Sequence, residues 1–260
     1  MADYLRSIWR VRHFWWHLSR ADLRARFRRS FFGILWAILQ PFGLMVLISL
    51  VFSRMFNQSI YDYAPYILSG IIIWECVTSV VVGGSLAFVQ ADAYIKQTRH
   101  PLAIYTLRNT VTSLCILMIA SVTLFGWVIV ALPQNIGMSW LAVPMVVPLL
   151  LVIAWPLATI MAYIGVRFRD LPNALALILQ AAWFVSPVYF KDSMFRSSGL
   201  HGLVDYNPIY HIMEIVRAPM LYGQWPTLTN FAWCLGTALV LFTIAALMGR
   251  RMEPKVIFYL

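Results

Sequence analysis

The stretch RADLRARFRRSFFGILWAILQP, residues 20–41, sets dense positive charge directly against the start of an apolar run. Five arginines lie between Arg20 and Arg29, and the chain is almost continuously apolar from Phe31 onward. Lysine and arginine are enriched beside membrane spans on the cytoplasmic side of a bilayer. This junction therefore predicts a transmembrane helix that begins near residue 31 and follows a cytoplasmic segment.

The composition is typical of a chain with several membrane spans. It has 260 residues, of which 61% are hydrophobic and 12% charged, and its mean hydropathy is +0.75. Soluble domains carry about twice that share of charged residues. The net charge is +10, but the basic residues flank apolar runs, which favours a membrane surface over nucleic acid as the partner. The cysteines Cys76, Cys115 and Cys234 lie in apolar runs and predict neither a disulfide framework nor a zinc site.

Six apolar runs are long enough to cross a bilayer, which takes about 20 residues. They cover residues 31–53, 64–89, 109–132, 140–166, 171–190 and 228–249. With a cytoplasmic N-terminus, 16 of the 20 lysines and arginines lie on the cytoplasmic side, in agreement with the positive-inside rule. The predicted fold is an all-α polytopic membrane protein, with a cytoplasmic helix over residues 1–30, a six-span domain over residues 31–260 and both termini in the cytoplasm.

The N-terminal segment has the pattern of an amphipathic helix lying in the membrane interface. At helical spacing one narrow stripe contains Arg6, Arg10, His13, His17, Arg20, Arg24 and Arg28, and the opposite face contains Ile8, Val11, Trp15 and Leu18. The apolar face is expected to point toward lipid. Arg20, Arg24, Arg28 and Arg29 are candidates for binding an anionic headgroup or a lipid-linked pyrophosphate. Simple retention in the cytoplasm and contact with a cytosolic partner remain alternatives.

The segment 191–227 is too apolar for a plain loop and too short for two spans. We expect one or two short re-entrant helices, which need protein or water around their irregular backbone. An amphipathic surface helix is the alternative. His211 and Glu214 share a helical face, but two side chains do not make a metal site, so no metal is predicted.

The chain contains neither a phosphate-binding motif nor many charges within its spans. No G-x-x-x-x-G-K-[ST] motif is present, and Glu75 is the one clear mid-span charge. Ion-coupled carriers usually need several such groups. Uphill transport by this chain would therefore draw its energy from another subunit.

Five stretches resemble the bacterial polysaccharide-export permeases, the type-2 membrane subunits of ABC exporters for O-antigen, capsule and teichoic acid. They are the opening stretch 20–41, YAPYILSGIIIWE, YIKQTRHP, GVRFRDLPNALALILQAAWFVSPVYF and YNPIYHIMEIVRAPM. The sequence around Arg169–Asp170 and Ser186–Pro187 resembles the O-antigen branch of this family more than the capsule branch. The resemblance implies a non-enzymatic homodimer in the bacterial inner membrane that exports an undecaprenyl-linked polysaccharide. It also implies two copies of a separate nucleotide-binding subunit, which carries the ATP and Mg, and no cofactor in this chain.

The resemblance assigns the loop 90–102 as the coupling helix that contacts the ATPase. Its candidate contacts are Tyr94, Ile95, Lys96, Arg99 and His100, and the turn with Arg169 and Asp170 is a second, weaker contact. A solvated turn is the alternative for the loop, and a helix-capping salt bridge is the alternative for the Arg169–Asp170 turn.

A sugar polymer needs a route that is neither purely apolar nor strongly charged. The C–H faces of sugars stack on aromatic rings, and their hydroxyls form hydrogen bonds with polar side chains. The resemblance favours spans one and five as channel and lateral gate. The candidates are Trp36, Gln40, Pro41, Trp74, Glu75, Gln180, Trp183, Phe184, Ser186 and Tyr189. Candidates for a periplasmic gate are Tyr206, Asn207, Pro208, Tyr210, Glu214 and Arg217. Packing or interface anchoring is the alternative for any single aromatic residue, and Glu75 could instead bond across the dimer or stay protonated.

Two rival functions remain open. A drug or lipid exporter of the same architecture would need a narrow, apolar cavity without an aromatic lining. An integral-membrane enzyme acting on lipid-linked sugars would need an acidic cluster, whereas Asp92, Asp170 and Asp205 are isolated in the sequence.

Overall fold

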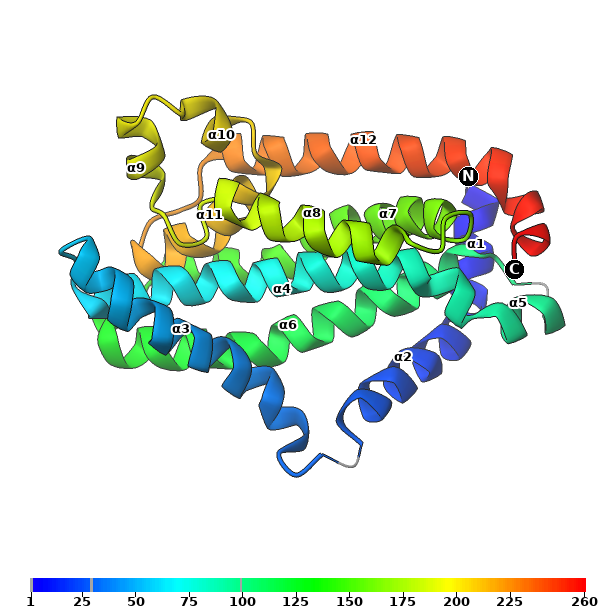
Figure 1. The fold of residues 1–260 in the computed structure, drawn as a ribbon, viewed down its shortest axis with the longest axis horizontal. Helices are drawn as coiled ribbons and strands as arrows, with labels where there is room; N and C mark the ends of the chain where they lie inside the picture. Colours follow the sequence, from blue (N-terminus) through cyan, green and yellow to red (C-terminus); the bar gives the residue numbers. More distant parts are fainter. Residues whose placement is uncertain (1, 29, 99) are drawn as a thin grey trace.

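The computed structural model describes residues 2–28, 30–98 and 100–260, and this part of the chain is helical with no β-strand. Figure 1 shows an elongated bundle whose long helices run roughly along its long axis. The α-helices are α1 (Ala2–Arg10), α2 (Arg12–Phe27), α3 (Trp36–Met55), α4 (Ile60–Gln90), α5 (Asp92–Gln97), α6 (Ala103–Ala131), α7 (Val146–Gly165), α8 (Leu171–Val185), α9 (Asp192–Ser197), α10 (His201–Asp205), α11 (Pro208–Leu221) and α12 (Leu228–Met252). The 3₁₀ helices are η1 (Gly33–Leu35), η2 (Pro133–Asn135), η3 (Met138–Met145) and η4 (Glu253–Phe258).

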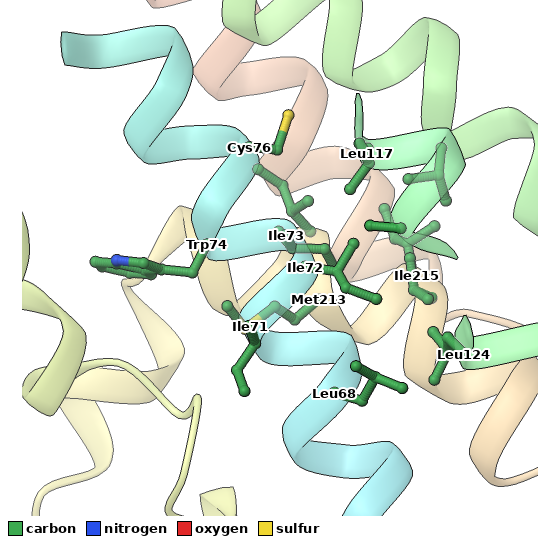
Figure 2. Close-up of a cluster of buried hydrophobic side chains, with 14 of the residues drawn as sticks. Leu68, Ile71, Ile72, Ile73, Trp74, Cys76, Leu117, Leu124, Met213 and Ile215 are labelled. Atoms are coloured by element: carbon green, nitrogen blue, oxygen red, sulfur yellow. The ribbon is translucent and has the colours of Figure 1, made fainter. Parts of the chain in front are cut away.

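Helix α4 forms the centre of the bundle and packs against α3, α6, α7 and α8. Figure 2 shows Leu68 and Ile72 of α4 beside Leu117 and Leu124 of α6, with Ile215 of α11 completing the apolar cluster. Burying such side chains is the main favourable term for a soluble core, but between membrane helices close packing takes its place.

Glycines let α4 and α7 approach each other closely. A Cβ at Gly165 would lie 2.0 Å from the carbonyl oxygen of Ser85, and one at Gly84 would lie 2.8 Å from the Cα of Ala158. Small residues at such a contact allow backbone-to-backbone packing of membrane helices. The α4–α7 pair is therefore a fixed part of the bundle.

Five helices in the described ranges are long and apolar enough to cross a membrane. They cover Gly33–Met55, Ile60–Gln90, Ala103–Ala131, Met138–Gly165 and Leu228–Phe258. The sixth predicted span, 171–190, differs: α8 has 15 residues and is about 22 Å long at 1.5 Å per residue, less than a hydrocarbon core of about 30 Å. It ends at Val185 because Pro187 has no N–H and disfavours helix at the residue before it. The long apolar run continues in the sequence, but the helix does not.

The N-terminal segment departs from the predicted single interfacial helix. It is broken at Val11 into α1 and α2. Ile8 is only 5% exposed and packs with Phe88 and Ile104, and Val11, Trp15 and Leu18 join the same apolar cluster. The face predicted to meet lipid thus covers the ends of α4 and α6, because these helices are longer than a bilayer core and leave apolar side chains to be covered.

Both termini lie at one end of the bundle, together with α5 (Figure 1). The Tyr4 hydroxyl donates to Glu253 Oε1 at 3.0 Å, and the Leu102 backbone N–H donates to the same oxygen at 3.2 Å. Burial and the neighbouring Glu253 carboxylate raise the pKa of the Tyr4 phenol, which keeps its proton available for this bond. One carboxylate therefore ties α1, the start of α6 and the C-terminal η4 together.

The segment 191–227 folds as three helices at the opposite end of the bundle, α9, α10 and α11 (Figure 1). Helix α11 packs against α4, α12 and η3, and most of its side chains are buried. It is therefore not the surface helix considered as an alternative. Its re-entrant position in a bilayer stays a prediction.

Candidate functional site: a lateral groove

A groove of about 1050 Å³ lies between α2, α3, α4, α6 and α8. Along α4 it extends from Ile72 to Gln90, about 27 Å of helix, from the middle of the bundle toward the end that holds both termini. Eight of the ten predicted channel residues line it: Trp36, Gln40, Trp74, Glu75, Gln180, Trp183, Phe184 and Tyr189. Pro41 and Ser186 do not. Pro41 is buried within the continuous helix α3, and Ser186 is buried behind the end of α8.

One wall of the groove is a row of aromatic rings. Trp183 of α8 lies 6.1 Å from Trp74 and 5.3 Å from Tyr189 between ring centroids, with Tyr189 nearly parallel to it. Figure 2 shows Trp74 pointing to the side of α4 opposite Leu117. The Trp183 Nε1–H has no hydrogen-bond partner among the described residues. Trp183 and Tyr189 are partly exposed in this wall, whereas Trp74 is buried beside them.

Glu75 is part of this groove and is bonded within the chain. The Gln40 side-chain amide donates to Glu75 Oε1 at 3.2 Å, which links α3 to the middle of α4. This contact fits the predicted polar lining. It also gives Glu75 a partner that does not require a second copy of the chain.

The opposite wall is polar, and the sequence reasoning missed it. Four residues of α6 line it together with residues of α2 and α4: Asp22, Arg26, Thr78, Ser79, Arg108, Asn109, Thr112 and Ser113. The Ser79 and Ser113 hydroxyls are 2.9 Å apart, and the Asn109 amide donates to the Val80 carbonyl at 3.3 Å. Arg108 forms an ion pair with Asp22 through two nitrogens. The signal was the i, i+4 spacing of Arg108 with Thr112 and of Asn109 with Ser113.

Helix α5 stands at the end of the bundle beside the N-terminal helices. Lys96 pairs with Asp92 at 2.8 Å, and both are exposed. Tyr94 is 40% exposed, and its ring contacts Phe14 of α2 at 6.0 Å, while His100 lies 5.1 Å from the same ring. Ile95 is partly buried in the apolar cluster below α5. Arg99, a further predicted coupling residue, lies outside the described residues.

The turn between α7 and α8 exposes Arg169 and Asp170. Asp170 takes the N-cap position of α8, yet its side chain makes no capping hydrogen bond. The helix-capping alternative for this pair is therefore not observed, and both side chains are available for a partner.

Arg217, a predicted gate residue, is fully buried. Its guanidinium donates to Ser69 Oγ at 3.1 Å, to the Pro187 carbonyl at 2.9 Å and to the Tyr66 carbonyl at 3.2 Å. It also lies 3.7 Å from the centroid of the Tyr66 ring. Glu214, one helical turn earlier on α11, forms an ion pair with the guanidinium at 3.8 Å. We call Arg217, Tyr63, Tyr66, Ser69 and residues 186–190 the Arg217 cluster.

The Arg217 cluster holds the chain that leaves α8. The Tyr63 hydroxyl donates to the Tyr189 carbonyl at 2.7 Å, and the Tyr66 hydroxyl donates to the Phe190 carbonyl at 3.1 Å. The Asn207 side chain caps α11 and also donates to Ser186 Oγ at 3.0 Å. Backbone carbonyls that no helix uses are thus satisfied by side chains from α4 and α11.

The other predicted gate residues surround this cluster. Pro208 is the first residue of α11, Tyr206 is exposed, and the Tyr210 hydroxyl donates to Asp192 at 3.4 Å. Both ring nitrogens of His211 are hydrogen-bonded, one to Asn230 at 2.9 Å and one to the Asp205 carbonyl at 3.0 Å. The described residues contain no group of three or more His, Cys, Asp and Glu side chains placed to hold a metal.

The predicted headgroup arginines lie outside the groove. Arg20, Arg24 and Arg28 are exposed on or just after α2, with Arg20 stacked 5.2 Å from the ring of Trp16. Arg29 lies outside the described residues. The cations of the groove are Arg26 and Arg108, which were not among the candidates.

A second, smaller cavity of about 210 Å³ lies between α4, α6, α7 and α11. Its lining is mostly apolar and includes Ile72, Leu124, Val143 and Val216. Sites for drug-sized ligands usually have about 300–1,000 Å³. This cavity is therefore too small to be the main site of a drug exporter.

Comparisons with known proteins agree with this architecture. A family model described as "ABC-2 type transporter" matches residues 13–221. An O-antigen export system permease protein RfbA of Myxococcus xanthus is 28% identical over 115 residues, 44% of this chain and 44% of that protein. A protein of the same name from Klebsiella pneumoniae is 25% identical over 92 residues, 35% of this chain and 36% of the relative. The chain thus spans less than half the length of these curated relatives.

The family match covers most of the chain, from α2 to the end of α11, and includes every helix that lines the groove. Together with the five helices able to span a membrane, it confirms the predicted class of protein. The chain is a membrane protein that belongs to the ABC-2 type transporter family.

Proposed function

We propose that this chain is the permease half of an ATP-driven exporter that moves an undecaprenyl-linked polysaccharide, such as O-antigen, across the bacterial inner membrane. The observation that carries the proposal is the groove, which sets an aromatic wall opposite a polar wall in an ABC-2 chain. The names of the relatives support O-antigen as the polymer.

The groove suits a glycan better than a drug or a simple lipid. The partly exposed rings of Trp183 and Tyr189 and the exposed ring of Phe184 can contact sugar C–H groups, while Trp74 is buried beside Trp183. The buried Trp183 N–H has no partner among the described residues and could donate to a hydroxyl that reaches it. Asn109, Thr112 and Ser113 on the facing wall supply further hydrogen-bonding groups. A narrow, purely apolar cavity would favour the drug or lipid exporter, and the small second cavity is below the size such a ligand needs.

Two copies of the chain form the channel, each closing the open side of the other's groove. In this arrangement α8 acts as the sixth membrane segment and, with α3, as the lateral gate. Both termini and α5 face the cytoplasm, while α9, α10 and α11 face the periplasm. Tyr206, Asn207, Pro208, Tyr210 and Glu214 border the periplasmic exit, and Arg20, Arg24, Arg28 and Arg29 hold membrane headgroups. Nucleic acid has no part in this function.

ATP and Mg belong to a separate nucleotide-binding subunit, present in two copies, since this chain has no phosphate-binding loop. Helix α5 transmits its movement through Tyr94, Ile95, Lys96, Arg99 and His100, with Arg169 and Asp170 as a second contact. The ring contact of Tyr94 with Phe14 supports this route, because it links α5 to α2 at the edge of the groove. No cofactor and no catalysis reside in the chain itself.

The test is co-purification with the nucleotide-binding subunit, followed by ATPase assays in proteoliposomes. The chain is tagged, co-expressed with its cognate subunit and compared with Tyr94→Ala. Tyr61→Ala is the matched control, because Tyr61 is also exposed but lies at the opposite end of the bundle. We expect loss of coupled ATPase activity for Tyr94→Ala alone. Failure of any such subunit to bind the wild-type chain would overturn the exporter proposal.

A further inference from the structure

Arg108 of α6 makes two polar contacts with the amphipathic helix α2 beside the groove, in addition to the apolar packing of Trp15 and Leu18. Its guanidinium donates through Nε and Nη2 to the two carboxylate oxygens of Asp22. Its backbone carbonyl accepts a hydrogen bond from the Ser19 hydroxyl at 3.3 Å, one helical turn earlier on α2. This two-point contact fixes how α2 sits on the groove wall.

The ion pair lies inside the groove rather than in the core. Asp22, Arg26 and Arg108 all line the groove, and the Arg108 and Asp22 side chains are 18% and 31% exposed. Arg26 lies one turn after Asp22 on α2 and is exposed. Two guanidinium groups and one carboxylate therefore line the same groove as the amide and hydroxyls of Asn109, Thr112 and Ser113.

The carboxylate of Asp22 occupies the position that an anionic ligand would take. The forked donors of a guanidinium match two phosphate oxygens as well as they match a carboxylate. A pyrophosphate carries more charge than a carboxylate and can contact Arg26 at the same time. In a partly desolvated groove this difference favours exchange of the side-chain carboxylate for the ligand.

We propose that Arg108 and Arg26 form a phosphate-binding subsite for the lipid-linked substrate and that Asp22 is its internal competitor. Entry of the pyrophosphate displaces Asp22 from Arg108 and releases this end of α2 from α6, which opens the groove toward the membrane interface. The proposal rests on the proposed function and specifies which residues recognise the substrate's anionic group. It assigns that role to the groove rather than to the exposed Arg20, Arg24 and Arg28.

A purely structural ion pair and a ligand-displaced ion pair predict opposite behaviour of its two members. If the pair only supports the fold, Arg108→Gln and Asp22→Asn change ligand binding in the same direction or not at all. If Asp22 competes with the ligand, Arg108→Gln weakens binding and Asp22→Asn strengthens it. Arg54→Gln is the matched control, because Arg54 is an exposed arginine at the end of α3 remote from Arg108 and does not line the groove.

The experiment measures binding of undecaprenyl pyrophosphate to the full chain in nanodiscs of uncharged phosphatidylcholine. We expect about tenfold weaker binding for Arg108→Gln, severalfold tighter binding for Asp22→Asn and no change for Arg54→Gln. Weaker binding by both variants overturns the proposal, as does an unchanged affinity for both. Thermal unfolding of each variant identifies any that fails to fold, and in that case Arg26→Gln, which breaks no ion pair with Asp22, is expected to weaken binding alone.

A distance measurement tests the release of α2 directly. Spin labels at Arg24→Cys and Val122→Cys, both exposed positions on α2 and α6, are introduced with the three native cysteines replaced by serine. Undecaprenyl pyrophosphate is expected to lengthen or broaden the distance distribution, and undecaprenol is not. If phosphatidylglycerol alone changes the distance distribution in the same way, the site binds any anionic lipid. That result would overturn the proposed substrate subsite.

Failure of this proposal is distinguishable from failure of the proposed function. Binding of undecaprenyl pyrophosphate that ignores Arg108 and Asp22 contradicts the subsite and leaves the exporter intact. A wild-type chain that binds none of this probe contradicts the choice of lipid-linked substrate itself.

Discussion

Arg217 and Arg108 are both arginines on helices of an apolar bundle, but their surroundings differ sharply. Arg217 is fully buried and bonds two backbone carbonyls, a serine hydroxyl and the face of Tyr66. Arg108 is 18% exposed and bonds a single carboxylate on another helix. Two of the partners of Arg217 are backbone carbonyls of the folded bundle, whereas the single partner Asp22 can move with α2.

This difference divides the molecule into a part that is held fixed and a part that can open. At the Arg217 cluster the chain after α8 is held by hydrogen bonds from α4 and α11. At the groove, rings, hydroxyls and an ion pair line a space with few direct links across it. Variants in the two regions should therefore affect different quantities, stability in the first and export in the second.

The largest effect on stability is expected for Arg217→Met. The substitution removes three buried guanidinium hydrogen bonds and leaves the Glu214 carboxylate without its buried cation, so it should lower the free energy of unfolding by about 3 kcal/mol or more. Arg196→Met is the control, because Arg196 makes only exposed ion pairs, which contribute about 1 kcal/mol or less. Denaturant unfolding in detergent measures both. Equal losses for the two variants would show that the Arg217 cluster is not the fixed region.

The second-largest loss of stability is expected for Gly165→Ala. Its Cβ would meet the Ser85 carbonyl oxygen at 2.0 Å, so α4 and α7 must move apart, at an expected cost of about 1–3 kcal/mol. Gly126→Ala is the matched control, since a Cβ there has no neighbour within 4 Å and alanine favours the helix by about 0.5–1 kcal/mol. The same unfolding assay should therefore give opposite signs for the two glycines. A stable Gly165→Ala would mean that the α4–α7 contact is looser than it is here.

Phe184→Leu should affect export rather than stability. Phe184 lines the groove and is 61% exposed, so its loss should change the free energy of unfolding by about 0.5 kcal/mol or less. Export of the polysaccharide, measured by its appearance at the cell surface, is expected to fall severalfold. Leu239→Ala, an exposed position on α12 that does not line the groove, should leave export unchanged. A defect at Leu239 equal to that at Phe184 would count against a special role for the groove.

The smallest effect on both stability and ATPase coupling is expected for Asp92→Asn. The Asp92–Lys96 pair is exposed on both sides and spaced i, i+4, which is worth about 0.5 kcal/mol or less. Unfolding should hardly change, and ATPase coupling should stay close to wild type. A large loss of coupling here would extend the proposed coupling contact from Tyr94 to the whole face of α5.

Apolar periodicity and length predicted five long helices well, because a span must satisfy its backbone internally wherever apolar side chains meet lipid. They could not predict the end of α8, where Pro187 and the donors of Tyr63, Tyr66 and Arg217 replace helical hydrogen bonds. The break at Val11 and the packing of Ile8 were also missed, since an amphipathic pattern does not distinguish a lipid surface from a protein surface.

The aromatic wall was predicted because Gln180, Trp183 and Phe184 share one helical face. The polar wall was not predicted, because in the sequence Arg108 is one of many basic residues beside spans and Asp22 lies within the arginine-rich stretch 20–29. Pairing between residues 86 positions apart depends on how α2 packs on α6, and no local pattern reports it. Arg217 pairs with Glu214 one turn earlier on the same helix, but the sequence does not show that its closest acceptors are the Pro187 and Tyr66 carbonyls of distant segments.

The most direct test of the groove as the substrate site is photo-cross-linking in cells that make the lipid-linked polysaccharide. A photoreactive phenylalanine analogue is placed at Phe184, with the same analogue at Leu239 as the control. If the groove holds the substrate, illumination attaches the glycan to the chain at position 184 and not at position 239. Attachment at 239 alone, or at neither position while export continues, would contradict the account.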